Sequence, residues 1–374
     1  MNILQVNSSL GWSGGQEQVL LLSKGLAERG HQVIIAAPPE SELCRRAREA
    51  GIPVEGVDIS RKLTISPVRR LKEILVNKKI DLVNSHKPLP HFFALLAVLW
   101  AKTPALVASR RVSFPISKNL FSYLKWKMRV DTFIAVSEEV KKSLLSFGIA
   151  PENVEVIYSG VDLKRFDPVI SGETVRKEYG IDPATPLVGQ VANYIAWKGY
   201  DIFFQAVKLV IEKFPHAKFL AVGRETSYVE EMRTAAKELG IDQQLIFTGF
   251  RRDMPEIYAA LDVTVSASLK GEGLAGVLRE SLAMETPVVA SDVGGNREIV
   301  INGKTGFCIP SADPYLLAER IIWLLSHREE AKSMGKEGRR LVKEHFTVEH
   351  MVARTEQVYW ETLQRRTLCS STSV

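Results

Sequence analysis

The sequence predicts an α/β protein with two domains, each built on a parallel sheet flanked by helices. Three observations support this prediction. First, a chain of 374 residues is too long for one ordinary core and suits two domains. Second, short apolar runs alternate with amphipathic segments through the first half. Third, a polar stretch at 169–186 interrupts this alternation, which then starts again, so we interpret that stretch as a linker.

The first half, 1–168, begins with the buried strand "NILQV" and the helix 14–30, whose Val19, Leu22 and Leu26 share one face. Each later strand is a short run rich in Val, Ile, Leu and Ala, and a helical segment lies between most neighbouring runs. The expected strands are 2–6, 31–37, 52–57, 80–86, 105–109 and 132–137, and the expected helices are 14–30, 42–51 and 66–79. This spacing is typical of a Rossmann-like domain.

The second half, 187–345, repeats the pattern. Its expected strands are 187–193, 218–223, 244–250, 263–268, 287–291 and 307–310, with helices between them. The segment 346–366 is amphipathic and predicts a final helix. Ligands of such sheets bind beyond the carboxyl ends of the strands, so we expect a ligand cleft between the two halves.

Composition and motifs exclude several classes of protein. Cys44, Cys308 and Cys369 are scattered, which predicts neither disulfides nor a CxxC metal site and fits a reducing cytoplasm. The N-terminus lacks the pattern of a signal peptide, and the longest apolar run, 92–101, is about half of a membrane span. The first strand-to-helix turn, "SSLGWSGGQEQ", does not match G-x-G-x-x-G, and no P-loop occurs, which disfavours a bound NAD or NTPase chemistry.

Almost the whole excess of basic over acidic residues lies in one segment. Residues 102–129 hold seven Lys and Arg and no acidic residue, interleaved with Phe114, Phe121, Tyr123 and Trp126. Such a stripe can lie on an anionic lipid surface, and the alternative is a solvated helix face. Because no nucleic-acid-binding motif accompanies the charge, we expect no nucleic-acid partner.

The segment "KGEGLAGVLRESLAMETPVVAS" at 270–291 carries the most specific signal. Glu272 follows a predicted strand, within glycines that allow close backbone approach, and Glu280 lies eight residues further on, in a helix. Eight helical residues rise about 12 Å, too far for an acid–base pair. The two carboxylates instead suit two parts of one long ligand whose phosphates lie at the helix N-terminus. A nucleotide diphosphate sugar has this length.

Six further segments accompany this spacing of glutamates, and they are "GGNREIV", "GGQEQVLLLSKGLAERGHQV", "IAVSEEVKKSLLSFG", "VIYSGVDLKRFDP", "WKGYD" and "GFRRDMPEIYAALDVTV". Together with the spacing, they make nearly the whole chain resemble retaining glycosyltransferases of family 4. The resemblance implies the GT-B fold, two Rossmann-like domains facing each other across a cleft, with a C-terminal helix that returns to the N-terminal domain. It also implies that the C-terminal domain binds the donor and the N-terminal domain binds the acceptor.

The resemblance assigns roles to individual residues. Glu272 would bind donor-sugar hydroxyls, Glu280 the ribose, and Lys198 would neutralise the charge that develops on the leaving diphosphate. The resemblance also implies donor binding by the glycines Gly14 and Gly15 of the first turn and by Gly273. The backbone amides around Leu274, Ala275 and Gly276 would hold the diphosphate. Asn193, Arg224, Phe250 and Arg251 are further expected donor-binding residues. Without the resemblance, Glu280 could simply compensate the helix dipole, Lys198 could be a surface lysine, and Gly14 and Gly15 a turn.

Two departures from the family pattern affect the expected site. Ala192-Asn193 stands where relatives often have Gly-Arg, so we expect Arg224 to supply the missing charge, with Arg251 or Arg252 as alternatives beside Phe250.

Arg110 or Arg111 stands where several relatives have an active-site histidine. Because an arginine stays protonated, it cannot act as a base, but it can bind an anionic acceptor or the donor phosphate. We therefore expect Arg111 to act with Glu272 and Lys198 as a catalytic residue, and we expect Arg110 to bind the acceptor. His86 ends a strand and is a candidate for acceptor binding, whereas His91 begins a helix and is expected to be structural.

We therefore expect a retaining glycosyltransferase that needs no metal and acts on a nucleotide diphosphate sugar and a glycan or glycolipid acceptor, for example lipopolysaccharide. We expect it in the cytoplasm, on the inner face of the membrane. The alternatives are a sugar-nucleotide epimerase of the same fold and a non-catalytic sugar-nucleotide-binding subunit.

Overall fold

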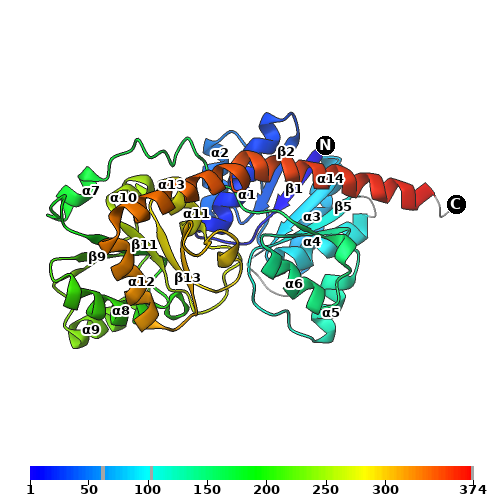
Figure 1. Cartoon of the computed structure of the whole chain (residues 1–374). Coiled ribbons are helices and arrows are strands. Elements are labelled where there is room, and N and C mark those ends of the chain that lie inside the picture. The colour runs from blue at the N-terminus through cyan, green and yellow to red at the C-terminus, as the bar shows by residue number, and fades with distance from the viewer. Residues whose placement is uncertain (60–63, 102–103, 372–374) are drawn as a thin grey trace. The chain divides into compact units, whose positions relative to one another are not determined.

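The computed structural model of the chain describes residues 1–59, 64–101 and 104–371 (Figure 1). The chain forms two compact units. The first contains Met1–Gly160 and the C-terminal segment from Val348, and the second contains Val161–Thr347. Each unit holds one parallel sheet with helices on its faces, so the predicted α/β class with two Rossmann-like domains is confirmed.

The sheet of the first unit has the strand order β3-β2-β1-β4-β5-β6-β7. Its strands are β1 (Asn2–Val6), β2 (Gln32–Ala37), β3 (Val54–Gly56), β4 (Leu82–His86), β5 (Ala105–Arg110), β6 (Thr132–Ala135) and β7 (Val154–Val156). Its helices are α1 (Gly14–Glu28), α2 (Glu42–Glu49), α3 (Ser66–Asn77), α4 (Pro88–Ala101), α5 (Leu120–Lys127), α6 (Glu138–Ser146), the short η1 (Pro151–Asn153) and α14 (Val348–Ser371).

Alternating side chains of this sheet enter two different cores. Leu4, Val83 and Leu106 pack against α3 and α4. Ile3, Leu82 and their neighbours on the other face pack against α1 and α14. This division follows from the period of two along a strand, which points successive side chains to opposite faces. The C-terminal helix α14 is thus part of the core of the first unit.

The sheet of the second unit has the order β10-β9-β8-β11-β12-β13. Its strands are β8 (Leu187–Val191), β9 (Lys218–Val222), β10 (Leu245–Gly249), β11 (Val263–Ser266), β12 (Val288–Ser291) and β13 (Gly306–Ile309). Its helices are α7 (Glu173–Glu178), α8 (Tyr200–Lys213), α9 (Val229–Leu239), α10 (Met254–Ala260), α11 (Gly276–Ala283), α12 (Pro314–Ser326), α13 (Arg328–His345) and the short η2 (Ala196–Lys198) and η3 (Asn296–Glu298). The strand order reverses at β8 and β11, and such a switch point is where sheets of this kind bind ligands.

The boundary between the units differs from the expected one. Residues 161–168, expected in the first domain, belong to the second unit. There Val161 pairs with Thr347, and the carbonyl oxygen of Phe166 accepts a hydrogen bond from Arg339 at 3.1 Å. The stretch 169–186, expected as a linker, also lies in the second unit, where Arg176 of α7 donates to the carbonyl oxygen of Ala260 at 3.0 Å.

Candidate functional site

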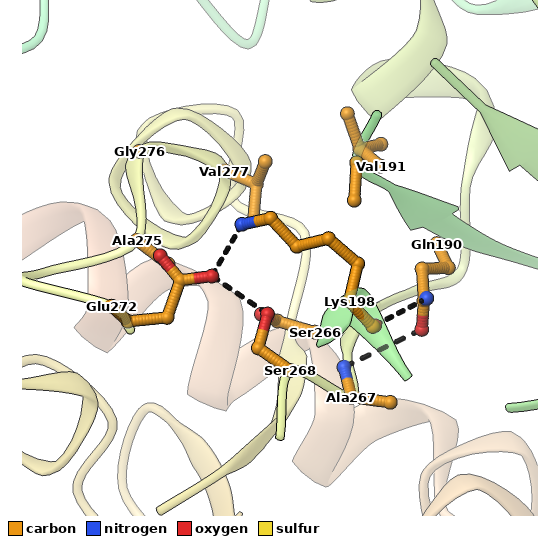
Figure 2. Close-up of a pocket in the computed structure, with 11 residues that line it drawn as sticks. Gln190, Val191, Lys198, Ser266, Ala267, Ser268, Glu272, Ala275, Gly276 and Val277 are labelled. Atoms are coloured by element: carbon orange, nitrogen blue, oxygen red, sulfur yellow. Dashed lines mark hydrogen bonds and ion pairs between the residues drawn. The ribbon is translucent and has the colours of Figure 1, made fainter. Parts of the chain in front are cut away.

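A polar pocket of the second unit lies where β8 and β11 end and α11 begins (Figure 2). All of its lining residues belong to this unit, and they are Gln190, Val191, Ala192, Lys198, Ser266, Ala267, Ser268, Glu272, Ala275, Gly276 and Val277. The pocket therefore occupies the switch point of the sheet, at the carboxyl ends of two adjacent parallel strands.

Lys198 and Glu272, which the sequence analysis proposed as catalytic residues, meet in this pocket. The ammonium of Lys198 forms an ion pair with Oε1 of Glu272, and the hydroxyl of Ser268 donates to the same oxygen at 2.6 Å (Figure 2). Both charged side chains are mostly buried, with 18% and 10% of their surface exposed. A cation and a carboxylate with little access to water can bind a phosphate and sugar hydroxyls more strongly than they could on an open surface.

The backbone around Lys198 is fixed by a glycine. Lys198 ends η2, and Gly199 after it has a left-handed φ of 68°. A Cβ atom on Gly199 would overlap the carbonyl oxygen of Ala267 at the end of β11. The side chain of Gln190 in β8 also donates to the carbonyl oxygen of Lys198 at 3.0 Å. The turn in "WKGYD" is therefore held directly against both strands that form the pocket.

The loop that carries Glu272 is held by the segment 294–296. The N–H of Gly295 donates to the carbonyl oxygen of Gly273 at 2.8 Å, and a Cβ atom on Gly294 (φ 60°) would overlap the carbonyl oxygen of Glu272. The buried Asn296 accepts from the N–H of Ala275 at 3.2 Å. The sequence analysis missed Asn296. This contact also changes one expectation, because the Ala275 amide, expected to hold a diphosphate, already has a partner within the protein.

Glu280 is the fifth of the eight residues of α11 and is not among the residues that line the pocket. The buried Tyr258 of α10 donates its hydroxyl hydrogen to Oε2 of Glu280 at 2.9 Å. A Cβ atom on Gly276 would lie 3.8 Å from Oε1 of Glu280, so this carboxylate lies beside the first turn of the helix. Glu272 and Glu280 thus have different hydrogen-bond partners within the protein. The sequence analysis missed Tyr258.

Two of the proposed donor-binding arginines have different surroundings. Arg251 forms ion pairs with Glu178 at 2.5 Å and Asp253 at 2.6 Å, and these hydrogen bonds raise its pKa. Because two carboxylates already balance this charge, Arg251 is a poor phosphate ligand. Arg224 lies 5.6 Å from the ring centroid of Phe250, which places these two proposed residues together.

Asn193 lies in a turn that packs on the turn before Arg224. A Cβ atom on Gly223 would overlap the carbonyl oxygen of Ala192, and the N–H of Tyr194 donates to the carbonyl oxygen of Arg224 at 3.1 Å. This contact brings Arg224 next to the position where the charge was expected. Ala192 lines the pocket, whereas Asn193, Arg224, Phe250 and Arg251 are not among its lining residues.

The proposed residues of the first unit lie at the carboxyl ends of β4 and β5 and at the start of α1. His86 ends β4 and Arg110 ends β5, and both are buried. Burial lowers the pKa of Arg110 to about 10, while its guanidinium donates to the carbonyl oxygen of Phe114. Arg111 donates to the hydroxyl of Ser159 at 2.8 Å.

Gly14 and Gly15 begin α1, and a Cβ atom on Gly14 would have no neighbour within 4 Å. His91 donates to or accepts from Ser85 at 3.0 Å, contacts the carbonyl oxygen of Lys125 at 2.9 Å and stacks on Trp126. These contacts give His91 a structural role in the core.

Among the described residues, no three His, Cys, Asp or Glu side chains are grouped so that they could hold a metal ion. No helix in the described part of the chain combines the length and apolar character that a membrane crossing requires.

Comparison with known families decides the identity. The family described as "Glycosyltransferase Family 4" matches residues 12–165, and "Glycosyl transferases group 1" matches residues 171–341. The two matches leave out only the ends of the chain and the short stretch 166–170. The chain belongs to this family of glycosyltransferases. It is therefore an enzyme of the glycosyltransferase class.

Individual relatives agree with this assignment. EpsD of Bacillus subtilis, to which a glycosyltransferase activity is ascribed, is 28% identical over 88% of this chain and 90% of its own length. The phosphatidyl-myo-inositol mannosyltransferase of Mycobacterium leprae is 27% identical over 87% of each chain.

Among solved structures, a glycosyltransferase from Rickettsia africae superposes with a TM-score of 0.88 at 23% identity, covering 97% of this chain and 98% of its own. HepE of Anabaena, solved in complex with UDP, gives 0.86 at 20% identity, covering 96% of this chain and 100% of its own. At this identity the superpositions show the fold alone, and they confirm that this glycosyltransferase has the GT-B fold.

Proposed function

We propose that this glycosyltransferase moves a sugar from a nucleotide diphosphate donor to a glycan or glycolipid acceptor with retention of the anomeric configuration. The observation that carries this proposal is the Lys198–Glu272 pair at the switch point of the second sheet, beside the start of α11. The complex of HepE with UDP supports a donor of the nucleoside diphosphate type.

The chemistry follows from the two charges. The bond between the sugar C1 and the diphosphate oxygen breaks, and negative charge develops on the leaving diphosphate. Lys198 stabilises this charge when it turns from Glu272 to the phosphate. The carboxylate of Glu272 then accepts hydrogen bonds from donor-sugar hydroxyls, while Ser268 continues to donate to it.

The new bond forms between C1 and the acceptor oxygen on the same face of the sugar. The acceptor proton passes to the departing phosphate, so the products are a glycoside and a nucleoside diphosphate. This route needs no histidine base, which is consistent with Arg110 at the end of β5 and Arg111 directly after it. Glu280, held by Tyr258, would bind the ribose hydroxyls of the donor.

A membrane-associated acceptor fits the surface of α5. Leu120, Tyr123 and Leu124 are exposed by 75%, 51% and 44%, and Lys125 and Lys127 lie on the same short helix. Apolar and basic groups together suit an anionic lipid surface. The mycobacterial relative named for phosphatidyl-myo-inositol supports a lipid acceptor. We therefore propose a glycolipid such as lipopolysaccharide as acceptor, and a peripheral location at the cytoplasmic face of the membrane.

The first test is donor binding, measured by thermal shift against a panel of nucleotide sugars. One nucleotide class should raise the melting temperature, and Glu280→Ala should weaken this shift because the ribose loses its carboxylate partner. Glu238→Ala, an exposed glutamate of α9 in the same unit, is the matched control and should behave like the wild type.

Turnover then separates the proposed activity from its alternatives. Release of nucleoside diphosphate that depends on an acceptor supports a transferase. Release without any acceptor, or a shift that is unchanged in Glu280→Ala, would contradict the proposal.

A further inference from the structure

A buried polar cluster lies inside the first unit, on the face of the sheet that α14 covers. Its members are Gln5 of β1, Asn84 and His86 of β4, Ser109 of β5 and Tyr359 of α14. Gln5 pairs in register with Asn84, and His86 pairs with Ser109, so all four strand residues point to the same face. Each member has at most 6% of its surface exposed.

The hydroxyl of Tyr359 lies at the centre of this cluster. Asn84 Nδ2 donates to it at 2.6 Å and Gln5 Nε2 donates to it at 3.3 Å. The hydroxyl of Ser109 donates to Oδ1 of Asn84 at 2.9 Å. An amide that donates through its nitrogen on one side presents its carbonyl oxygen on the other. With its nitrogen directed at Tyr359, the Gln5 amide presents its carbonyl oxygen to His86.

The orientation of Gln5 determines the tautomer of His86. The carbonyl oxygen of Gln5 lies 2.7 Å from Nε2 of His86. An oxygen can only accept, so Nε2 carries the hydrogen and donates it. In the neutral ring the other nitrogen, Nδ1, then has a bare lone pair. Within the described part of the chain, Nδ1 is buried and has no hydrogen-bond partner.

The ring is also held neutral. Burial lowers the pKa of His86 well below its usual value, and the nearby charge of Arg111 acts in the same direction. A neutral His86 at the carboxyl end of β4 thus offers one acceptor lone pair and no available proton.

We propose that Tyr359 is a positioning residue. Through the Gln5 amide it holds His86 as the Nε2–H tautomer. Nδ1 of His86 then accepts a hydrogen bond from a hydroxyl of the acceptor substrate. The residue that sets this proton position lies on the C-terminal helix, 273 positions after His86 in the sequence. The inference rests on the proposed transferase function for its substrate, but the tautomer itself can be measured without activity.

The test is NMR of the protein labelled with ¹⁵N-histidine, in which the ring nitrogen signals distinguish the two tautomers. In the wild type near pH 7, His86 should carry its proton on Nε2, and a His86→Gln variant assigns its signals among the seven histidines. In Tyr359→Phe the Gln5 amide loses its acceptor, so the fraction of the Nε2–H tautomer should fall. Turnover should fall about tenfold or more, with the KM for the donor unchanged.

Thr362→Val is the matched control. Thr362 lies one turn further along α14, is equally buried, and its hydroxyl contacts that of Thr132 at 2.8 Å. This variant also loses a buried hydroxyl between α14 and the sheet, but it leaves Gln5 and His86 untouched, so it should keep the wild-type tautomer and turnover. Gln5→Leu is the second variant. It removes the oxygen that accepts from Nε2 of His86, so the fraction of the Nε2–H tautomer should fall although no residue of α14 is substituted.

Each outcome decides the inference. A proton on Nδ1 in the wild type, or an unchanged tautomer in Tyr359→Phe, would overturn it. A shifted tautomer with turnover equal to that of Thr362→Val would overturn the role in catalysis. If no donor and acceptor pair gives turnover, the proposed function fails, while the NMR spectra still decide whether Tyr359 sets the tautomer.

Discussion

Two glycines of the second unit have nearly the same backbone conformation but different surroundings. Gly199 and Gly240 have φ values of 68° and 70°. A Cβ atom at Gly240 would meet nothing within 4 Å, whereas one at Gly199 would overlap the carbonyl oxygen of Ala267. The pair therefore separates the cost of a left-handed backbone from the cost of a steric overlap at the site.

We predict that Gly240→Ala lowers the free energy of unfolding by about 1 kcal/mol, the cost of a left-handed alanine. Gly199→Ala should cost roughly 3 kcal/mol or more, because the turn must move away from β11. That movement also displaces Lys198, so donor affinity should fall in Gly199→Ala and stay unchanged in Gly240→Ala. Chemical denaturation and donor titration measure both effects. Equal losses of stability would show that the overlap is relieved without cost.

At the scale of the element, the helix α5 has both a buried aromatic side chain and apolar side chains that are exposed to solvent. Its first turn begins with the exposed Leu120, and the ammonium of Lys127 lies 4.5 Å from the ring centroid of Tyr123. Its Trp126, by contrast, is buried against Phe133 and anchors the helix to the core. The helix is thus held by one aromatic residue while other apolar side chains remain exposed to solvent.

We predict that the protein sediments with vesicles containing anionic lipid and not with neutral vesicles. A double Lys125→Glu, Lys127→Glu variant should lose roughly tenfold or more in vesicle affinity, because each basic residue near an anionic surface contributes about 1 kcal/mol. The control is Lys141→Glu with Lys142→Glu, the same charge reversal on α6 of the same unit. An equal loss in both double variants would indicate a general charge effect and would exclude α5 as the membrane contact.

At the scale of the whole molecule, the buried histidines are unevenly distributed. Every buried histidine in the described residues lies in the first unit. Burial lowers the pKa of His91 to about 4 and lowers that of His86 well below its usual value. In the unfolded chain both rings take up protons near pH 6.5. Their contribution to stability is therefore complete above that pH and is lost as the pH falls.

We predict that acidification from pH 7 to pH 5 destabilises the first unit more than the second. With a folded pKa of about 4, His91 alone should cost about 2 kcal/mol over this range. Calorimetry at the two pH values should show the first unit melting earlier in acid. His91→Gln should reduce this dependence, whereas His216→Gln, an exposed position of the second unit, should not. A pH dependence unchanged in His91→Gln would contradict the assignment.

The sequence alone was enough for the alternation of strands and helices, because a buried parallel strand and an amphipathic helix each leave a local periodic pattern. It missed β7, whose three residues are too few to show a period. It also found Glu272, because glycines beside it mark a turn at a strand end. Lys198 was found only through the resemblance of "WKGYD" to the family.

Only the tertiary structure decided the partners of these residues. Tyr258 reaches Glu280 across 22 positions, Asn296 reaches Ala275 across 21, and Tyr359 reaches Gln5 across 354. Arg251 matched the charge expected at the site, yet Glu178, 73 positions away, binds it instead. Hydrogen bonds and ion pairs between distant segments leave no periodic trace in a single sequence, because they depend on which strands and helices the fold brings together.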